Sequence, residues 1–144
     1  MPEQLSLLGW TPPQAELSFE ERDIRAATLD ARIARAVAVA LAECGKTRPA
    51  IAREMSAILA EPVSANMLDA YASVARGQHR ISVSRFVALM QATGDRRLLQ
   101  LLAATMGWAV VEKRHLKLIE AAELREQEDF LRRRREAAMR EARR

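Results

Sequence analysis

The sequence predicts an all-α protein in which a compact bundle of five helices is followed by a long C-terminal helix. Glycine and proline are scarce, with five of each among 144 residues, and aromatic residues make up only 4%. Apolar residues recur three and four positions apart along most of the chain, which is the spacing of helices that bury one face. These stretches alternate with residues that cap or end helices. At this length we expect one core rather than two.

Charge divides the chain into three predicted segments. Residues 1–27 carry two basic and five acidic side chains, and we expect a mobile acidic tail with a short helix there. Residues 28–111 are the predicted helical domain, in which residues 28–107 carry ten basic and six acidic side chains. Residues 112–144 are a predicted charged helix. A basic body with an acidic N-terminal segment suits a polyanionic partner.

No motif of an enzyme, a metal site or a membrane protein is present. There is no glycine-rich phosphate loop and no metal-ligand spacing, and the two histidines, His79 and His115, are far apart. We therefore expect no catalytic activity, no metal and no cofactor. The absence of an 18-residue apolar run and of a signal-peptide pattern predicts a cytoplasmic protein without a membrane segment. The single cysteine, Cys44, excludes an intrachain disulfide.

The first predicted helices lie between Ser18 and Gly45. Ser18 and Glu21 have the spacing of a capping box, in which each side chain bonds the backbone N–H of the other residue. The apolar phase changes near Thr28, so we expect a second helix that Thr28 caps and Gly45 ends. Its predicted inward residues are Leu29, Ile33, Val37, Leu41 and Cys44.

Two helices joined by a bend are predicted between Thr47 and Arg76. Thr47 caps the first, and Ser64 caps the second after the break at residues 61–62. Pro49 suits the first turn, where a missing backbone N–H costs nothing. The residues expected to face the core are Ile51, Met55, Ile58 and Leu59 in the first helix and Met67, Leu68, Tyr71, Val74 and Ala75 in the second.

This pair resembles a helix-turn-helix. Residues 63–71, VSANMLDAY, are similar to the V-S-x-x-x-L-x-x-[W/Y] half that contains the recognition helix, and residues 51–55, IAREM, are similar to the I-A-x-x-L of the first helix. The usual motif joins the two through one residue, whereas residues 56–62 intervene here, so we expect an extended bend. The resemblance implies a helix that enters the major groove of DNA. An ordinary helical hairpin is the alternative.

Two further helices complete the predicted bundle. Ser82 caps one and Gly94 ends it, while Asp95 caps the other and Gly107 ends it. The residues expected to face the core are Val83, Phe86, Val87 and Met90, and then Leu98, Leu99, Leu102 and Met106. Residues 108–111, WAVV, are predicted to be a short strand or the lead-in to the last helix.

Residues 81–99, ISVSRFVALMQATGDRRLL, resemble a segment of the CII-like phage regulatory proteins, with the pattern L-x-x-A-x-x-L-M-x-x-T-G-D-x-R-L-L. Those proteins are small helix-turn-helix transcription regulators of bacteriophages and prophages. With the half-motif upstream, the resemblance spans about residues 33–111. It implies DNA binding and oligomerisation without catalysis.

The resemblance also predicts which residues touch DNA. Bases should meet the side of the second helix that faces away from Leu68 and Tyr71. Asn66 can bond adenine twice, Asp69 can accept from cytosine, and alanines can meet a thymine methyl group. The predicted base-reading residues are Ser64, Ala65, Asn66, Asp69, Ala70 and Ser73. The predicted phosphate contacts are Lys46, Thr47, Arg48, Arg53, Arg76 and Arg80, with His79 as a further candidate; the alternative is a merely solvated rim.

Residues 112–144 contain no glycine or proline and are predicted to form a long exposed helix. Its apolar residues are sparse. Three of them recur seven apart, but the position that would complete a coiled-coil seam holds polar residues, so no strong coiled coil is expected. These apolar residues are Leu124, Leu131 and Ala138, and the polar ones are Glu120, Gln127 and Arg134. Arginines 132–135 either solubilise the helix or grip nucleic acid non-specifically.

We expect a homo-dimer or higher homo-oligomer, because one small recognition helix rarely gives enough specific affinity alone. The interface is expected after Met106 and not along the arginine-rich end, since clustered apolar residues outside the bundle lie there. These residues are Trp108, Val110, Val111, Leu116 and Ile119.

A second motif lies in the N-terminal tail. Residues 4–8, QLSLL, resemble the short peptide through which bacterial proteins dock on the replicative sliding clamp, Q-L-[S/D]-L-[F/L]. An exposed segment of this kind offers one amide and a few aliphatic anchors to a preformed pocket. The anchors would be Gln4, Leu5, Leu7 and Leu8. Alternatively, these leucines and Trp10 pack on the chain's own domain.

The sequence therefore favours a sequence-specific double-stranded DNA-binding transcription regulator of phage or prophage type. The alternative is a replication-associated interaction protein that docks on the sliding clamp through residues 4–8. A third possibility is an antitoxin-like DNA binder whose tail holds its partner.

Overall fold

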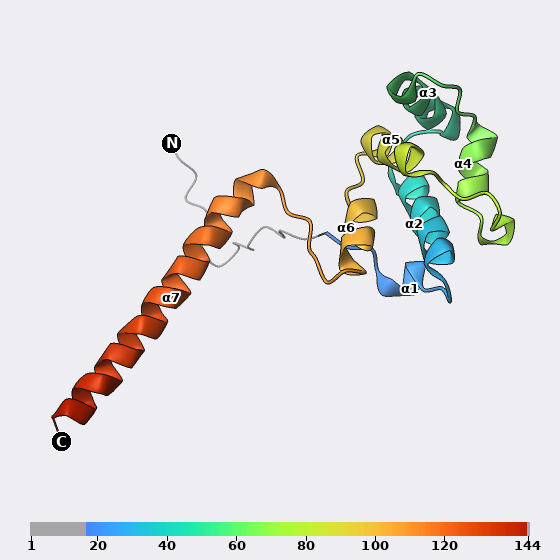
Figure 1. Ribbon diagram of the computed structural model, residues 1–144. Helices are drawn as coiled ribbons and strands as arrows, with labels where there is room; N and C mark the ends of the chain where they lie inside the picture. Colours follow the sequence, from blue (N-terminus) through green and yellow to red (C-terminus); the bar gives the residue numbers. More distant parts are fainter. Residues whose placement is uncertain (1–16, 144) are drawn as a thin grey trace, which may run out of the picture. The chain divides into compact units, whose positions relative to one another are not determined.

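The computed structural model describes residues 17–143 (Figure 1). Of these residues 71% are helical, and the described part contains no strand. The chain divides into two compact units. One reaches as far as Val110 and is here called the helical unit, and the other begins at Val111. The prediction of an all-α protein with a long C-terminal helix is confirmed.

Helix α2, Leu29–Glu43, is the centre of the helical unit. It packs against α1 (Glu21–Ile24), α6 (Arg97–Ala104), α4 (Ala65–Tyr71) and the 3-10 turn η1 (Val74–Arg76), and Figure 1 shows these elements around it. Thr28 caps α2 as predicted, because its Oγ1 accepts from the N–H of Ala31 at 3.2 Å. Gly45 follows the helix at φ +74°, as expected of a C-terminal glycine.

The remaining core helices are α3, Arg48–Leu59, and α5, Val83–Thr93, which pack against each other. Thr47 and Ser82 cap them through the N–H groups of Ala50 and Arg85, as predicted. Gly94 ends α5 at φ +69°. Asp95 was expected to cap α6, but the cap position is Arg96; the Asp95 carboxylate still accepts from the N–H of Arg97 at 3.1 Å.

The buried faces agree with the prediction in part. The residues that are buried as predicted are Val37, Leu41, Ile51, Met55, Leu68, Tyr71, Phe86 and Leu98. Alanines occupy much of the interior, and Ala36, Ala40 and Ala88 are completely buried. With these small residues at the centre of the buried face, several larger apolar residues lie at its edge and stay exposed. Residues that were wrongly expected to face inward are Leu29, Ile58, Val74, Ala75, Val83, Val87, Leu99 and Met106, all of them exposed.

The second helix of the bent pair is shorter than expected. Helix α4 ends at Tyr71, and the chain then forms η1 instead of continuing to Arg76. Because the helix stops, Val74 does not return to the buried side and is 47% exposed.

The N-terminal border of the helical unit also differs from the predicted boundary at residue 28. Phe19 and Ile24 are 8% and 4% exposed and belong to the core. Ser18 was expected to cap α1, but the helix begins at Glu21 with Glu20 at its cap position. The earlier residues of the predicted tail lie outside the described part of the chain.

Arg97 joins three separate parts of the helical unit. Its Nη2 donates to Asp95 Oδ2 and to Glu43 Oε2, each at 2.7 Å, and its guanidinium lies 4.4 Å from the ring centroid of Phe19. The hydrogen bonds to Asp95 and Glu43 raise the pKa of Arg97 above its ordinary value, because they stabilise the charged guanidinium. The N-terminal segment, α2 and the turn before α6 are thereby held together.

The C-terminal end of the helical unit is fixed by Gln100, which is 3% exposed. Its Oε1 accepts from the N–H of Val110 at 2.6 Å, and its Nε2 donates to the carbonyl of Trp108. Gly107 ends the preceding turn as predicted, at φ +74°. Residues 108–110 therefore lie against α6 as an irregular segment and not as a strand.

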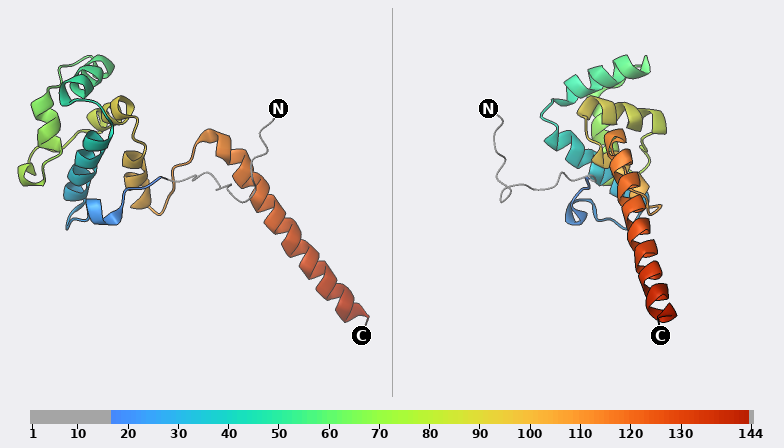
Figure 2. Two further views of the ribbon diagram at one scale, coloured as in Figure 1. Left: turned by 180° about the vertical axis from the view of Figure 1, so that it is seen from behind. Right: turned by 90° about the vertical axis from the view of Figure 1, so that its left-hand side faces the viewer.

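Helix α7, Lys113–Ala142, is one uninterrupted helix of 30 residues in every view (Figure 2). It has no buried residue. This agrees with the predicted long exposed helix.

Replacing Arg97 tests the junction. Arg97→Ala should lower the free energy of unfolding by about 2–3 kcal/mol, because three hydrogen bonds to the Asp95 and Glu43 carboxylates and one cation–π contact disappear. The unfolding free energy of Arg97→Lys should lie between those of the original chain and of Arg97→Ala, since lysine keeps the charge without the fork geometry. Arg35→Ala, at an exposed position on α2, is the control. Equal effects of the two alanine variants in urea unfolding would contradict this role.

Candidate nucleic-acid interface

The bend between α3 and α4 has a fixed geometry. Ala60 adopts a left-handed conformation, with φ +52°, and reverses the chain after α3. The hydroxyl of Ser56 contacts the carbonyls of Ala52 and Val63, at 2.7 and 3.2 Å, and accepts from the N–H of Val63 at 2.9 Å. Val63 is 8% exposed, so the bend is anchored in the core. Residues 56–62, which the sequence inserts between the two halves of the motif, are therefore held in place by these contacts.

One side of α4 is committed to the core. Leu68 is completely buried and Tyr71 is 8% exposed. The Tyr71 hydroxyl accepts from Arg85 Nη1 at 2.6 Å, and Arg85 Nε donates to Glu61 Oε1 at 3.1 Å. The hydrogen bond to Tyr71, with that to Glu61, raises the pKa of Arg85. This chain of contacts connects the bend, α4 and α5, and it restrains α4 against rotation.

The solvent side of α4 is narrower than predicted. Asn66 and Asp69 are exposed, whereas Ala70 is 8% exposed and packs inward, so it cannot meet a base from this position. Ser64 uses its hydroxyl to cap the helix through the N–H of Met67 at 3.2 Å. Ala65 and Ser73 are half-buried. Of the six predicted base-reading residues, Ser64, Asn66 and Asp69 are exposed, and the Ser64 hydroxyl is used by the cap.

Several predicted phosphate contacts are engaged within the chain. Lys46 Nζ lies 2.9 Å from Glu54 Oε1 and donates to the carbonyl of Ala92 at 2.7 Å. Arg48 Nε donates to Asp69 Oδ1 at 3.2 Å, and its Nη1 donates to the carbonyl of Leu41. These two cations contribute to the fold, and their charges are partly balanced. Thr47 is the cap of α3.

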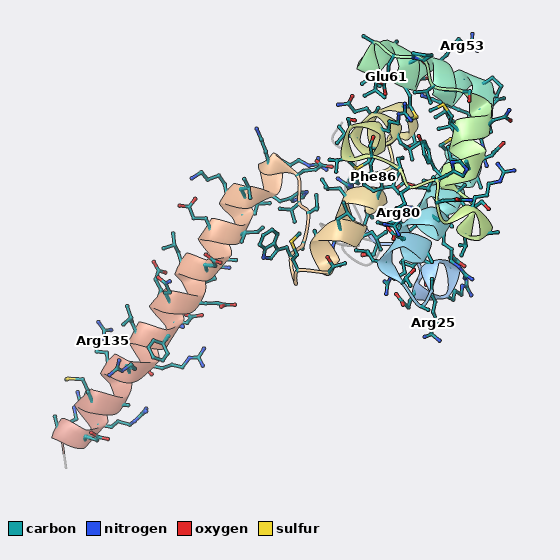
Figure 3. The ribbon with its side chains drawn as sticks, turned by 45° about the vertical axis from the view of Figure 1, so that its right-hand side comes forward. Arg25, Arg53, Glu61, Arg80, Phe86 and Arg135 are labelled. Carbon is teal, nitrogen blue, oxygen red and sulfur yellow. The ribbon has the colours of Figure 1, made fainter. Side chains whose placement is uncertain are left out.

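Arg53 and Arg76 are exposed and make no ion pair within the described residues. Arg53 lies on the outer side of α3 at one end of the helical unit, and Arg25 lies at the opposite end (Figure 3). Arg53 is therefore the best-placed cation of α3 for a phosphate, because no internal partner has to be displaced.

A shallow cavity of about 310 Å³ lies between the start of α2 and the segment after α4. Arg76, His79 and Arg80 line it together with Asp30. Arg80 Nε is 3.2 Å from Asp30 Oδ2, and this carboxylate reduces the attraction of the cavity for an anion. His79 is exposed, so the cavity brings together the polar residues of the predicted connection without forming a closed site.

The residues predicted for self-association differ in exposure. Trp108 is 66% exposed, and Leu116 and Ile119 are 54% and 42% exposed on α7. Val110 is half-buried, and Gln100 holds its backbone. Val111 is also half-buried. The clamp-peptide residues Gln4, Leu5, Leu7 and Leu8 lie outside the described residues.

Two residues whose contacts hold the bend and α4 in place, Ser56 and Arg85, were not predicted from the sequence. Ser56 looked like an ordinary helix residue, and its role depends on the reversal at Ala60, which spacing does not reveal. Arg85 lies beside the predicted cap Ser82, but its partners Tyr71 and Glu61 are distant in sequence. No pattern of spacing within one helix would have shown either contact.

No family model, no curated protein and no solved structure matches this chain. Within residues 17–143 no cluster of histidine, cysteine, aspartate and glutamate is suited to hold a metal ion. None of the described helices combines the length and apolar character needed to span a membrane.

Ser56→Ala tests whether the bend fixes α4. The substitution leaves the partly buried N–H of Val63 without its partner, so we expect a loss of about 1–3 kcal/mol in unfolding free energy. Amide hydrogen exchange should increase in α4 more than in α6. Ser84→Ala, at an exposed position on α5 where the hydroxyl contacts only that of Ser82 among the described residues, is the control and should not change exchange in α4. Unchanged exchange in α4 would show that the hydroxyl does not hold the bend.

Proposed function

We propose that this chain is a sequence-specific double-stranded DNA-binding transcription regulator of phage or prophage type, with α3, the bend and α4 as an extended helix-turn-helix. In this proposal α4 enters the major groove and α3 lies across the sugar–phosphate backbone. The proposal combines the sequence resemblance with the arrangement of residues 47–71.

The observation that carries the proposal is the position of Asn66. This residue is exposed in the first turn of a capped helix whose opposite side, with Leu68 and Tyr71, is buried. A side chain amide can bond adenine through both its oxygen and its nitrogen, which discriminates between base pairs. Base reading requires a firmly held backbone, and the contacts of Ser56 and Arg85 supply this support.

Charge supports the same proposal. Residues 28–107 have ten basic and six acidic side chains, and two exposed arginines are Arg53 within α3 and Arg76 in η1 after α4. Because Lys46 and Arg48 are engaged internally, the electrostatic contribution of one copy is limited. A dimer or higher oligomer, which doubles the contacts, would bring the affinity into the range of specific regulators.

The pairing of Arg48 with Asp69 changes the expected role of Asp69. A carboxylate at 3.2 Å from a guanidinium is less available to accept from cytosine. In our proposal Asp69 orients Arg48 at the edge of the groove, and Asn66 contributes most of the direct base reading.

Asn66→Ala is expected to cost about 1–3 kcal/mol of specific binding and to relax the preference at one base position. The measurement is selection of bound sequences from random duplex DNA, followed by titration of the selected duplex. Gln91→Ala removes an exposed amide from α5 and should change neither result. An unchanged consensus with Asn66→Ala would place the reading surface elsewhere.

Arg53→Ala should weaken binding to all duplexes to a similar degree. The loss of one phosphate contact should reduce the slope of log affinity against log salt by about 0.9. Arg25→Ala, at the other end of the helical unit (Figure 3), is the matched control and should leave the slope unchanged. A base-dependent effect, or an equal effect of the control, would rule out a phosphate contact at Arg53.

A further inference from the structure

Helix α7 exposes apolar side chains along its length. Leu116, Leu124, Phe130 and Leu131 are 54%, 55%, 57% and 62% exposed. These four flank a line of residues spaced by seven that passes through Gln127, whereas Leu118, which is 67% exposed, lies on the opposite side of the helix. An exposed apolar stripe of this length calls for a partner.

The line between these apolar residues has an ordered pattern of charge. Seven residues before Gln127 is Glu120, and seven residues after it is Arg134; at twice that spacing are Lys113 and Glu141. Each charge therefore has its opposite at the same distance on the other side of Gln127. A polar line of this kind weakens a parallel coiled coil, because each charge would meet its own copy.

We propose that two copies of this chain associate through α7, antiparallel and centred on Gln127. In this arrangement Glu120 of one copy faces Arg134 of the other, Lys113 faces Glu141, and the two Gln127 side chains meet. Every facing charge is then opposite in sign, and the unfavourable layers of a parallel pair become favourable ones. The centre also coincides with the middle of the helix, which runs from Lys113 to Ala142, so nearly its whole length is paired.

Three of the four apolar residues have an apolar neighbour in the same register, whereas Phe130 lies beside Glu123 of the other copy. Leu124 is three residues before Gln127 and Leu131 is four residues after it, so Leu124 of one copy lies beside Leu131 of the other on the same side of the pair. Leu116 and Ala137 are related in the same way on the opposite side. In the single chain Glu120 Oε2 lies 2.6 Å from Lys117 Nζ, and the Arg134 guanidinium lies 5.7 Å from the Phe130 ring centroid, so pairing between the copies would have to compete with these two contacts.

This inference moves the interface from residues 108–119, where the sequence suggested it, onto the whole of α7. The polar residues Glu120, Gln127 and Arg134, which disfavour a parallel coiled coil, favour the antiparallel orientation of the two helices. Because the facing charges remain partly exposed, the association should be of moderate strength and should weaken with added salt.

Charge reversal in the full-length chain tests the proposal by sedimentation equilibrium. Glu120→Arg or Arg134→Glu alone places like charges in two facing layers of the dimer. Each single substitution should raise the dissociation constant of the dimer about tenfold or more. The two substitutions together restore opposite charges in the antiparallel pair only. The double variant should therefore associate within about threefold of the original chain.

The controls are Glu136→Arg and Arg125→Glu, which change the same charges on the opposite side of α7 and should leave association unchanged. Thermal unfolding of the helical unit should be the same in every variant, because α7 has no buried residue. A monomeric full-length chain throughout the micromolar range would overturn the proposal. So would a double variant that stays as weak as the single ones, or controls that weaken association equally.

The proposal concerns assembly and does not depend on the function of α4. If Glu120→Arg is monomeric but selects the same DNA sequence with lower affinity, both proposals are supported. If it is monomeric and the original dimer binds no DNA, the pairing of α7 stands and the proposed function fails.

Discussion

Close packing through alanine on α2 is the constraint on which the rest of the helical unit depends. Ala36 and Ala40 are completely buried, next to Val37 and Leu41. With so few aromatic side chains, the unit cannot fill wide spaces between helices, so the helices must approach closely around one centre. Each buried methyl group then contributes dispersion contacts from several neighbours. The positions of α1, α4, α6 and η1 follow from their contacts with this helix.

Polar contacts at the edges of this core determine the directions of the connecting segments. Ser56, Arg85, Arg97 and Gln100 each join parts of the chain that apolar packing alone would leave free to turn. Their partners include backbone groups that would otherwise lose hydrogen bonds on burial, such as the N–H groups of Val63 and Val110. A bond of this kind stabilises modestly, but leaving its donor unpaired is costly. This cost favours one direction of α4 over its alternatives, which is what a reading helix needs.

The two ends of the described chain use charge differently. In the helical unit several cations are paired internally, so Arg53 and Arg76 remain as the exposed candidates for phosphate contacts. In α7 the charges lie along a helix without a core, where pairs such as Lys117 with Glu120 stabilise only the helix itself. In the proposed dimer, the symmetrical order of these charges about Gln127 places opposite charges of the two copies next to each other. Assembly through α7 would supply the second set of contacts that the limited charge of one helical unit makes necessary.

The sequence by itself determined the helical class, most of the caps and stops, and the long helix α7. These features depend on residues close together, such as Thr28 with Ala31 or Gly94 after α5, and short-range chemistry is visible in spacing. It also indicated Asn66 as an exposed residue of α4. The apolar spacing also predicted buried positions in five of the helices, namely Val37, Leu41, Ile51, Met55, Leu68, Tyr71, Phe86 and Leu98. Only the tertiary structure decided which small residues complete each buried face, because Ala36 and Ala88 look neutral until a neighbouring helix approaches them. It likewise decided that Ala70 is internal, that Phe19 joins the core and that Arg48 is engaged by Asp69, since each of these outcomes requires partners that are distant in sequence.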